Sequence, residues 1–89
     1  MKRWTTSGGI TIERLNTLRC NCYVIQCAGA VYLVDTSVVM ERQSIERQLK
    51  KLGISGLDGI ILTHVHTDHV GNAACFQKKF NCLVYVHAH

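Results

Sequence analysis

The chain has 89 residues, of which 47% are hydrophobic and 18% charged, and its formal net charge is +4. This composition excludes an intrinsically disordered chain, and the length allows one domain at most. The Lys and Arg residues are scattered, without the clustered basic stripe typical of nucleic-acid binding, so we expect a solvated surface and no nucleic-acid partner.

The sequence shows no membrane-spanning or secretory segment. No apolar stretch reaches the length of about 18 residues that a spanning helix needs, and residues 1–9 lack the apolar core of a signal peptide. We therefore expect a cytoplasmic protein with reduced thiols and no membrane partner. The odd number of cysteines, five, also argues against a disulfide framework.

The first half of the chain predicts strands. Partly alternating apolar residues after Gly8 and Gly9 predict a strand over 9–14. Residues 21–35 predict a hairpin with a tight turn at 28–30, and the apolar run 31–34 suggests burial on both faces. We assign no strand before Gly8 and expect Trp4 to be a packing anchor or an exposed residue.

Cys20, Cys22 and Cys27 form a C-x-C-x4-C pattern near the start of this hairpin. Strand alternation turns Cys27 away from the other two, so we interpret all three as small core residues and not as a thiolate metal site.

The period of the apolar residues changes after the hairpin. Residues 41–52 predict an amphipathic helix with Ile45, Leu49 and Leu52 on its apolar face. Thr36 or Ser37 could cap the start of this helix, and Gly53 should end it.

The rest of the chain continues this alternation. A short buried strand is predicted over 60–62, ending at Thr63, and a last strand over 82–86. Residues 69–79 predict a second helix, whose inward side chains we expect to be Val70, Ala73, Ala74 and Phe76. This order of elements predicts a layered α/β fold with helices on a sheet.

The segment after the strand at 60–62 holds four candidate metal ligands: His64, His66, Asp68 and His69. Imidazoles with a carboxylate suit zinc, and iron and manganese are alternatives. His64 and His66 are two apart in extended backbone and can share one ion, whereas Asp68 and His69 come where the chain turns into a helix and can share a second. The alternative interpretation is a solvated polar loop.

The run from Thr63 to Asn72 resembles the H-x-H-x-D-H motif of the metallo-β-lactamase superfamily. Residues 21–25, 31–36, 58–63 and 84–87 resemble strands of the same family, although Ser37 stands where the family usually has Gly. The resemblance implies the α/β class and a layered αβ/βα sandwich of two similar halves. We expect residues 1–89 to be the N-terminal βββαβαβ half of one such domain, with the second half absent.

The resemblance also implies the roles of the motif residues. His64 and His66 would bind the first metal ion, and Asp68 and His69 would bind the second. Asp68 would act catalytically as well, because it would orient or deprotonate the attacking water. The cofactor would be zinc, binuclear in the complete domain.

Two further residues receive supporting roles from the resemblance. Asp35 would be a buried acid that steadies the metal loop by hydrogen bonding. From the sequence alone, Asp35 could instead be a turn residue or the cap of the following helix. Gly71 would let the start of the second helix pack close to the metal loop.

The activity implied is hydrolysis, in which a metal-bound hydroxide attacks a thioester, a lactone or a similar carbonyl centre of a small-molecule substrate. Residues 21–25 resemble hydrolases of the glyoxalase II kind more than nucleases, and His66 argues against the flavo-diiron type. Because the family takes further ligands from its second half, we expect this isolated chain to be incomplete and inactive. We interpret His87 and His89 as surface residues at a strand end.

Three alternatives stay open. The chain could be a non-catalytic metal-binding half-domain that forms a homodimer or pairs with a complementary second-half chain. It could belong to a nuclease-type branch of the same superfamily. It could also be a truncated gene product without function. We expect marginal stability and a tendency to associate, because half of the sandwich would be missing.

Overall fold

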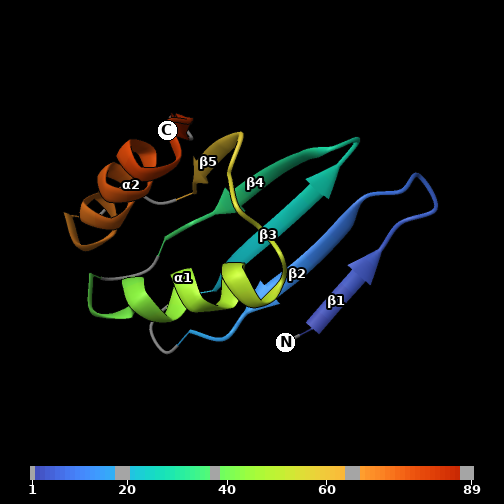
Figure 1. Ribbon diagram of the computed structural model, residues 1–89, viewed down its shortest axis with the longest axis horizontal. Helices are drawn as coiled ribbons and strands as arrows, with labels where there is room; N and C mark the ends of the chain where they lie inside the picture. Colours follow the sequence, from blue (N-terminus) through green and yellow to red (C-terminus); the bar gives the residue numbers. More distant parts are fainter. Residues whose placement is uncertain (1, 18–20, 37–38, 64–66, 87–89) are drawn as a thin grey trace.

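The computed structural model describes residues 2–17, 21–36, 39–63 and 67–86, with the backbone alone for residues 2, 39 and 67–71. These residues contain a six-stranded sheet whose strands lie in chain order, β1 to β6 (Figure 1). Strands β1 to β4 pair antiparallel, and β4, β5 and β6 pair parallel. This mixed sheet with its helices confirms the predicted α/β class.

The predicted elements all occur, with ends shifted by no more than two residues. The strands are β1 (Lys2–Thr5), β2 (Thr11–Leu15), β3 (Cys22–Cys27), β4 (Ala30–Val34), β5 (Gly59–Leu62) and β6 (Leu83–Val86). The helices are the 3-10 turn η1 (Val39–Glu41) and the α-helices α1 (Arg42–Lys51) and α2 (Thr67–Phe80).

Strand β1 is the element that the sequence did not predict. Arg3 lies opposite Glu13 in the register of β1 and β2, and its Nε donates to Glu13 Oε1 over 2.9 Å. The Glu13 carboxylate is buried, so this charge-assisted hydrogen bond offsets part of its desolvation. Trp4 is both exposed and packed, since 45% of it is accessible while its ring lies 6.4 Å from that of Tyr23.

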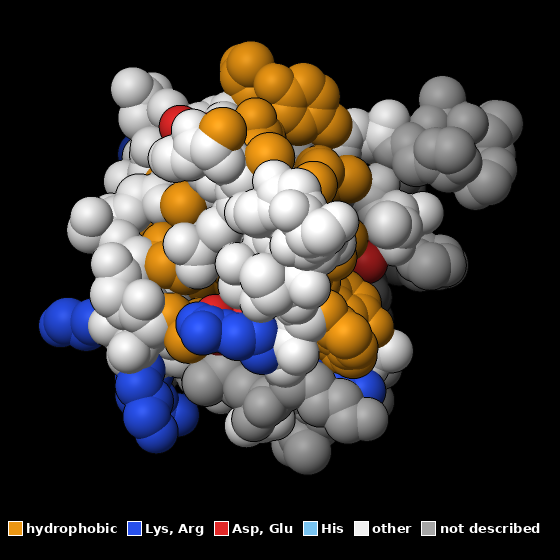
Figure 2. Space-filling model, turned by 90° about the vertical axis from the view of Figure 1, so that its right-hand side faces the viewer, with side chains coloured by type: hydrophobic (Ala, Val, Ile, Leu, Met, Phe, Trp, Pro, Cys, Tyr) orange, Lys and Arg blue, Asp and Glu red, His pale blue; other side chains and the backbone are white. Residues whose placement is uncertain are grey.

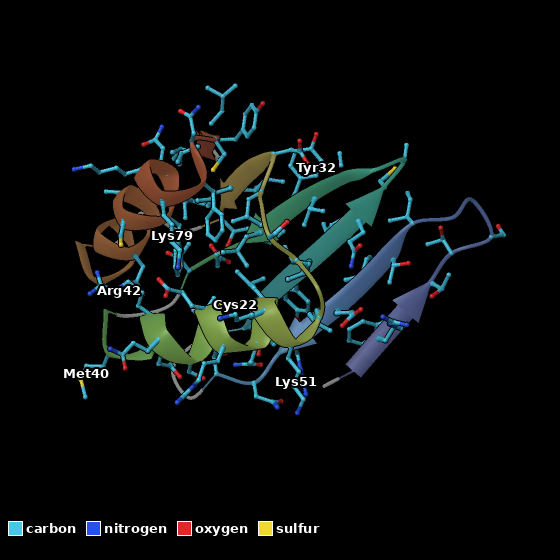
Figure 3. The ribbon with its side chains drawn as sticks, viewed as in Figure 1. Cys22, Tyr32, Met40, Arg42, Lys51 and Lys79 are labelled. Atoms are coloured by element: carbon cyan, nitrogen blue, oxygen red, sulfur yellow. The ribbon has the colours of Figure 1, made fainter. Side chains whose placement is uncertain are left out.

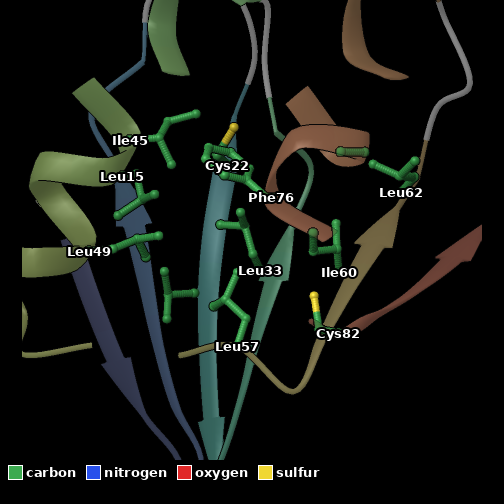
Figure 4. Close-up of a cluster of buried hydrophobic side chains, with 12 residues drawn as sticks. Leu15, Cys22, Leu33, Ile45, Leu49, Leu57, Ile60, Leu62, Phe76 and Cys82 are labelled. Atoms are coloured by element: carbon green, nitrogen blue, oxygen red, sulfur yellow. The ribbon is translucent and has the colours of Figure 1, made fainter. Parts of the chain in front are cut away.

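Both α-helices lie on the same face of the sheet (Figures 1 and 4). The connections β4–α1–β5 and β5–α2–β6 join adjacent parallel strands and step across the sheet in the same direction. Because such crossovers are right-handed, both helices fall on one side. The core fills the space between: Leu15, Cys22, Val24, Leu33, Ile45, Leu49, Leu57, Ile60, Leu62, Ala73, Phe76 and Cys82.

Helix α1 ends as expected and begins differently. Gly53 has a φ of 77°, its N–H donates to Lys50 O, and the N–H of Ile54 donates to Leu49 O, which is the Schellman arrangement. The expected cap at Thr36 is wrong, because Glu41 occupies the N-cap position after the η1 turn. The alternative cap, Ser37, lies outside the described residues.

An ion pair ties α1 to α2. Lys79 of α2 extends toward α1, where its Nζ lies 3.1 Å from Glu46 Oε2 (Figure 3). Both side chains are partly exposed, so this pair adds little to the free energy of unfolding.

Helix α2 turns a slightly different face inward than the sequence predicted. Ala73 and Phe76 are buried as expected, and Asn72 is fully buried beside them. Ala74 was expected to point inward but is exposed. Successive residues are offset by about 100° around the helix axis, so Ala74 lies on nearly the opposite side of the helix from Phe76, whereas Asn72 lies on the same side as Phe76.

The opposite face of the sheet, which we call the outer sheet face, carries no helix. Its apolar side chains are Trp4, Ile12, Tyr23, Ile25, Tyr32, Val34, Ile61, Leu83 and Tyr85. Leu83 is 63% exposed and Tyr85 is 49% exposed. The expected burial of 31–34 on both faces is wrong, because only Leu33, which faces the helices, is buried in this run. Figure 2 shows hydrophobic side chains at the surface on the side of the molecule that lies to the right in Figure 1.

No disulfide joins the described cysteines, Cys22, Cys27, Cys75 and Cys82, to one another. Cys22 is buried on the helix side of the sheet, as expected for a core residue, whereas Cys27 is half-buried and Cys20 lies outside the described residues. Burial raises the pKa of the Cys82 thiol above its ordinary value. Among the described residues, no helix is long and apolar enough to cross a membrane.

Candidate metal centre

The candidate site lies at the carboxyl edge of the parallel part of the sheet. Strands β4 and β5 run parallel, with Val34 opposite Ile61, so the residues that follow each strand come out at the same edge. Asp35 and Thr36 follow β4, and Thr63 follows β5. Ligand sites of α/β proteins are usually found at this edge.

Asp35 holds the residue that immediately precedes the histidine motif. Its Oδ1 accepts a hydrogen bond from the backbone N–H of Thr63 over 2.9 Å, and its Oδ2 accepts one from Thr63 Oγ1 over 2.6 Å. The backbone N–H of Asp35 donates to Ile61 O over 2.8 Å, extending the β4–β5 pairing by one step. Asp35 is only 8% exposed. Its carboxylate therefore bridges two strand ends, and it does not cap the following helix.

The backbone of Asp35 adopts a left-handed conformation, with a φ of 62°. Asp and Asn tolerate this region better than most other non-glycine residues, because their short polar side chains can bond locally. This conformation turns the chain out of β4 at the point where the carboxylate meets Thr63.

The structure places the motif residues only in part. His64 and His66 lie outside the described residues, so their expected coordination stays a prediction. Asp68 and His69 are in the first turn of α2, and Gly71 follows within the same helix. The start of a helix favours a carboxylate through the helix dipole, which suits Asp68. The expected close packing of Gly71 against the metal loop stays a prediction, because that loop lies outside the described residues.

The donor set itself fits zinc. Three imidazoles and one carboxylate within a few residues are the ligand types that zinc binds in proteins, and His64 and His66 have the spacing of two donors on one side of an extended chain. No group of three His, Cys, Asp or Glu side chains elsewhere in the described residues could hold an ion. The motif is therefore a stronger candidate than any group within the described part of the chain.

Asn72 and Thr36 contribute to the site in a way that the sequence analysis did not assign. Asn72 Nδ2 donates a hydrogen bond to the backbone carbonyl of Thr36 over 2.9 Å, and both residues are fully buried. The available signal was the position of Asn72 four residues before Phe76, which puts a polar side chain on the apolar face of α2.

A family model and several known proteins match this chain. The model described as the metallo-beta-lactamase superfamily matches residues 15–89. The anti-Pycsar protein Apyc1 of Paenibacillus xerothermodurans is 42% identical over 61 residues, which are 66% of this chain and 22% of that protein. The probable metallo-hydrolase YybB of Bacillus subtilis (strain 168) is 35% identical over 65 residues, which are 73% of this chain and 29% of that protein.

Solved structures share the fold. The subclass B3 metallo-beta-lactamase BJP-1 of Bradyrhizobium japonicum superposes with a TM-score of 0.74 at 24% identity, covering 94% of this chain and 32% of that chain. The class B3 di-zinc enzyme LRA-12, from an Alaskan soil metagenome, gives a TM-score of 0.73 at 21% identity, with the same two coverages. The 89 residues thus span less than a third of the length of these relatives.

Proposed function

The chain belongs to the metallo-β-lactamase superfamily, and from this we propose that it supplies four metal ligands of a zinc-dependent hydrolase. The observation that carries the proposal is the pair of hydrogen bonds that Thr63 donates to the Asp35 carboxylate, from its backbone N–H over 2.9 Å and from its Oγ1 over 2.6 Å. These two hydrogen bonds fix the end of β5 at the residue directly before His64. A histidine loop held in this way at the carboxyl edge of a sheet is suited to present its donors to a metal ion.

The motif residues and Asp35 have distinct tasks in this proposal, and Asp68 has two. His64 and His66 hold one ion, and Asp68 and His69 hold a second. When bound, zinc lowers the pKa of water to about 7, which provides a nucleophile at neutral pH. The Asp68 carboxylate orients that water or accepts its proton, and Asp35 keeps the loop in register by its bonds to Thr63.

The proposed substrate is a small molecule with a thioester, a lactone or a similar carbonyl group. The support comes from residues 21–25, which resemble hydrolases of the glyoxalase II kind and of which 22–25 form the start of β3. The scattered Lys and Arg residues also favour a small substrate over a nucleic acid. A nuclease-type activity is the second candidate within the same superfamily.

We further propose that the domain is completed by a second sheet layer on the outer sheet face. Four ligands shared between two ions leave each ion below the three protein ligands usual for catalytic zinc. The relatives are more than three times as long as the matched segments, so they have chain available for further ligands. A further segment of the protein, a complementary chain or a second copy would cover the apolar outer sheet face.

The outer sheet face should make the 89-residue chain associate. We expect Leu83→Lys combined with Tyr85→Lys to lower the mass measured by light scattering at high protein concentration, because two exposed apolar groups of the face become charged. The matched control is Val86→Lys, on the same edge strand and 52% exposed, but oriented toward the helix side. Equal association of the double variant and the wild type would contradict this prediction.

The first test of the metal site is the zinc affinity of the purified chain. We expect the 89-residue chain to bind zinc, and His64→Ala to weaken that binding at least tenfold, as measured by competition with a chelating dye. His89→Ala is the control, because it removes an imidazole outside the motif. We expect little turnover of thioester or lactone substrates by the chain alone, since neither ion has a complete set of ligands.

Two results would count against this function. Equal zinc affinity in wild type and His64→Ala would show that the motif does not bind the metal. Zinc binding that depends on His64, but without hydrolysis even after addition of the second half of a related domain, would favour the alternative of a non-catalytic metal-binding module.

A further inference from the structure

The buried Asn72 amide has a specific relation to the candidate metal loop. Its Nδ2 donates to the Thr36 carbonyl over 2.9 Å, although the two residues are 36 positions apart in the chain. A buried amide is costly unless it is hydrogen-bonded, so this contact selects one placement of α2 relative to the end of β4. The apolar contacts of Ala73 and Phe76 are less directional and would tolerate a small rotation or slide of the helix.

Thr36 stands next to Asp35, and the two neighbouring residues contact opposite ends of the motif. The Asp35 carboxylate binds Thr63, directly before His64, and the Thr36 carbonyl accepts from Asn72, three residues after His69. All of the candidate ligands lie between these two attachment points. One dipeptide at the end of β4 thereby fixes both the strand that leads into the motif and the helix that leaves it.

We propose that Asn72 is a positioning residue, which fixes the first turns of α2, and with them Asp68 and His69, against the end of β4. Asn72 comes one helical turn after Asp68. When the helix is anchored at Asn72, its rotation about its axis and its position along that axis are fixed, and so is the backbone position of Asp68. Two ions that share a substrate require this precision, because ligand positions must hold to a fraction of an ångström. The inference rests on the proposed function and extends it to a residue outside the ligand set.

The test compares Asn72→Leu and Asn72→Asp with Ile45→Val in the 89-residue chain. Leu and Asp are close to Asn in size, and both remove the N–H donor to Thr36. Ile45→Val makes a small loss in the buried face of α1, a different helix from that of Asn72, and so controls for general destabilisation. Two properties are measured: amide hydrogen exchange of the metal-free chain, and the affinity and visible absorption spectrum of bound Co²⁺.

We expect both Asn72 variants to speed exchange at the amides of residues 71–74 at least tenfold more than at the amides of α1. We also expect at least tenfold weaker Co²⁺ binding with an altered spectrum, because groups that orient metal ligands commonly contribute that much to affinity. Ile45→Val should leave the Co²⁺ spectrum unchanged and show no preferential exchange in α2.

The outcomes separate this inference from the function on which it rests. Exchange in the Asn72 variants that rises equally in α1 and α2, or Co²⁺ binding identical to the wild type, overturns the role of Asn72 while the metal site stands. A wild-type chain that binds Co²⁺ no better than His64→Ala overturns the proposed function, and with it the metal part of this inference. Preferential exchange in α2 would then still establish the anchoring of the helix.

Discussion

Replacing Asp35 by alanine is expected to lower the free energy of unfolding by about 3 kcal/mol, because it removes two hydrogen bonds from Thr63 to a buried carboxylate. Alanine is also less tolerant than aspartate of the left-handed backbone at this position, where φ is 62°. In a domain of this size the loss should lower Tm by about 15 °C. Urea unfolding followed by circular dichroism measures the change directly.

Two further variants test the explanation. Asp35→Asn keeps the shape and tolerates the backbone conformation, so we expect a smaller loss of about 1 kcal/mol. Asp58→Ala is the matched control, because the Asp58 carboxylate also accepts a backbone N–H, that of Val31 at 2.7 Å, but in an exposed position. A loss at Asp58 as large as that at Asp35 would show that burial of the carboxylate is not what matters.

The second large effect is expected for Phe76→Ala, which should cost about 3–5 kcal/mol. Phe76 is the largest of the fully buried side chains and packs between α2 and the sheet (Figure 4). An 89-residue domain has a total stability of about 4–13 kcal/mol. At the low end of this range, where the expected marginal stability puts this chain, the variant would be partly or wholly unfolded at room temperature. Urea unfolding and the one-dimensional proton NMR spectrum would show this.

The neighbouring aromatic residue provides the comparison. Phe80 lies on the same helix with its ring 6.1 Å from that of Phe76, but it is only half-buried. We expect Phe80→Ala to cost about half as much as Phe76→Ala, and Phe76→Leu to restore a cooperative transition because it refills most of the space. A greater loss of unfolding free energy for Phe80→Ala than for Phe76→Ala would contradict the central place of Phe76 in the core.

Much of the fold could be predicted from the sequence because the apolar periodicity is clear. Ile45 and Leu49 mark the inner face of α1, and Gly53 ends that helix in the expected left-handed conformation. Strand β1 could not be predicted in this way, since its four residues include two cations and lack an apolar alternation. It depends on a tertiary contact between Arg3 and the buried Glu13, which the local pattern of apolar residues does not predict.

The candidate site was predicted through its motif, and the contacts that support it were predicted less completely. The spacing of His64, His66, Asp68 and His69 is visible in the sequence, as is the acid at the end of β4. The role of Asn72 depends on a partner 36 residues away and on a backbone carbonyl, which is present in every residue and leaves no mark in the sequence.

The strict chain order of the six strands has a consequence for how the molecule forms. Each new strand is added to the edge left open by the preceding one, and no strand has to be inserted between two that are already paired. The pairings within β1–β4 are also local in sequence, which favours rapid folding. The sheet can therefore grow in the order of synthesis on the ribosome. By the time the histidine motif emerges, β4 has already brought Asp35 and Thr36 to the edge where they receive it.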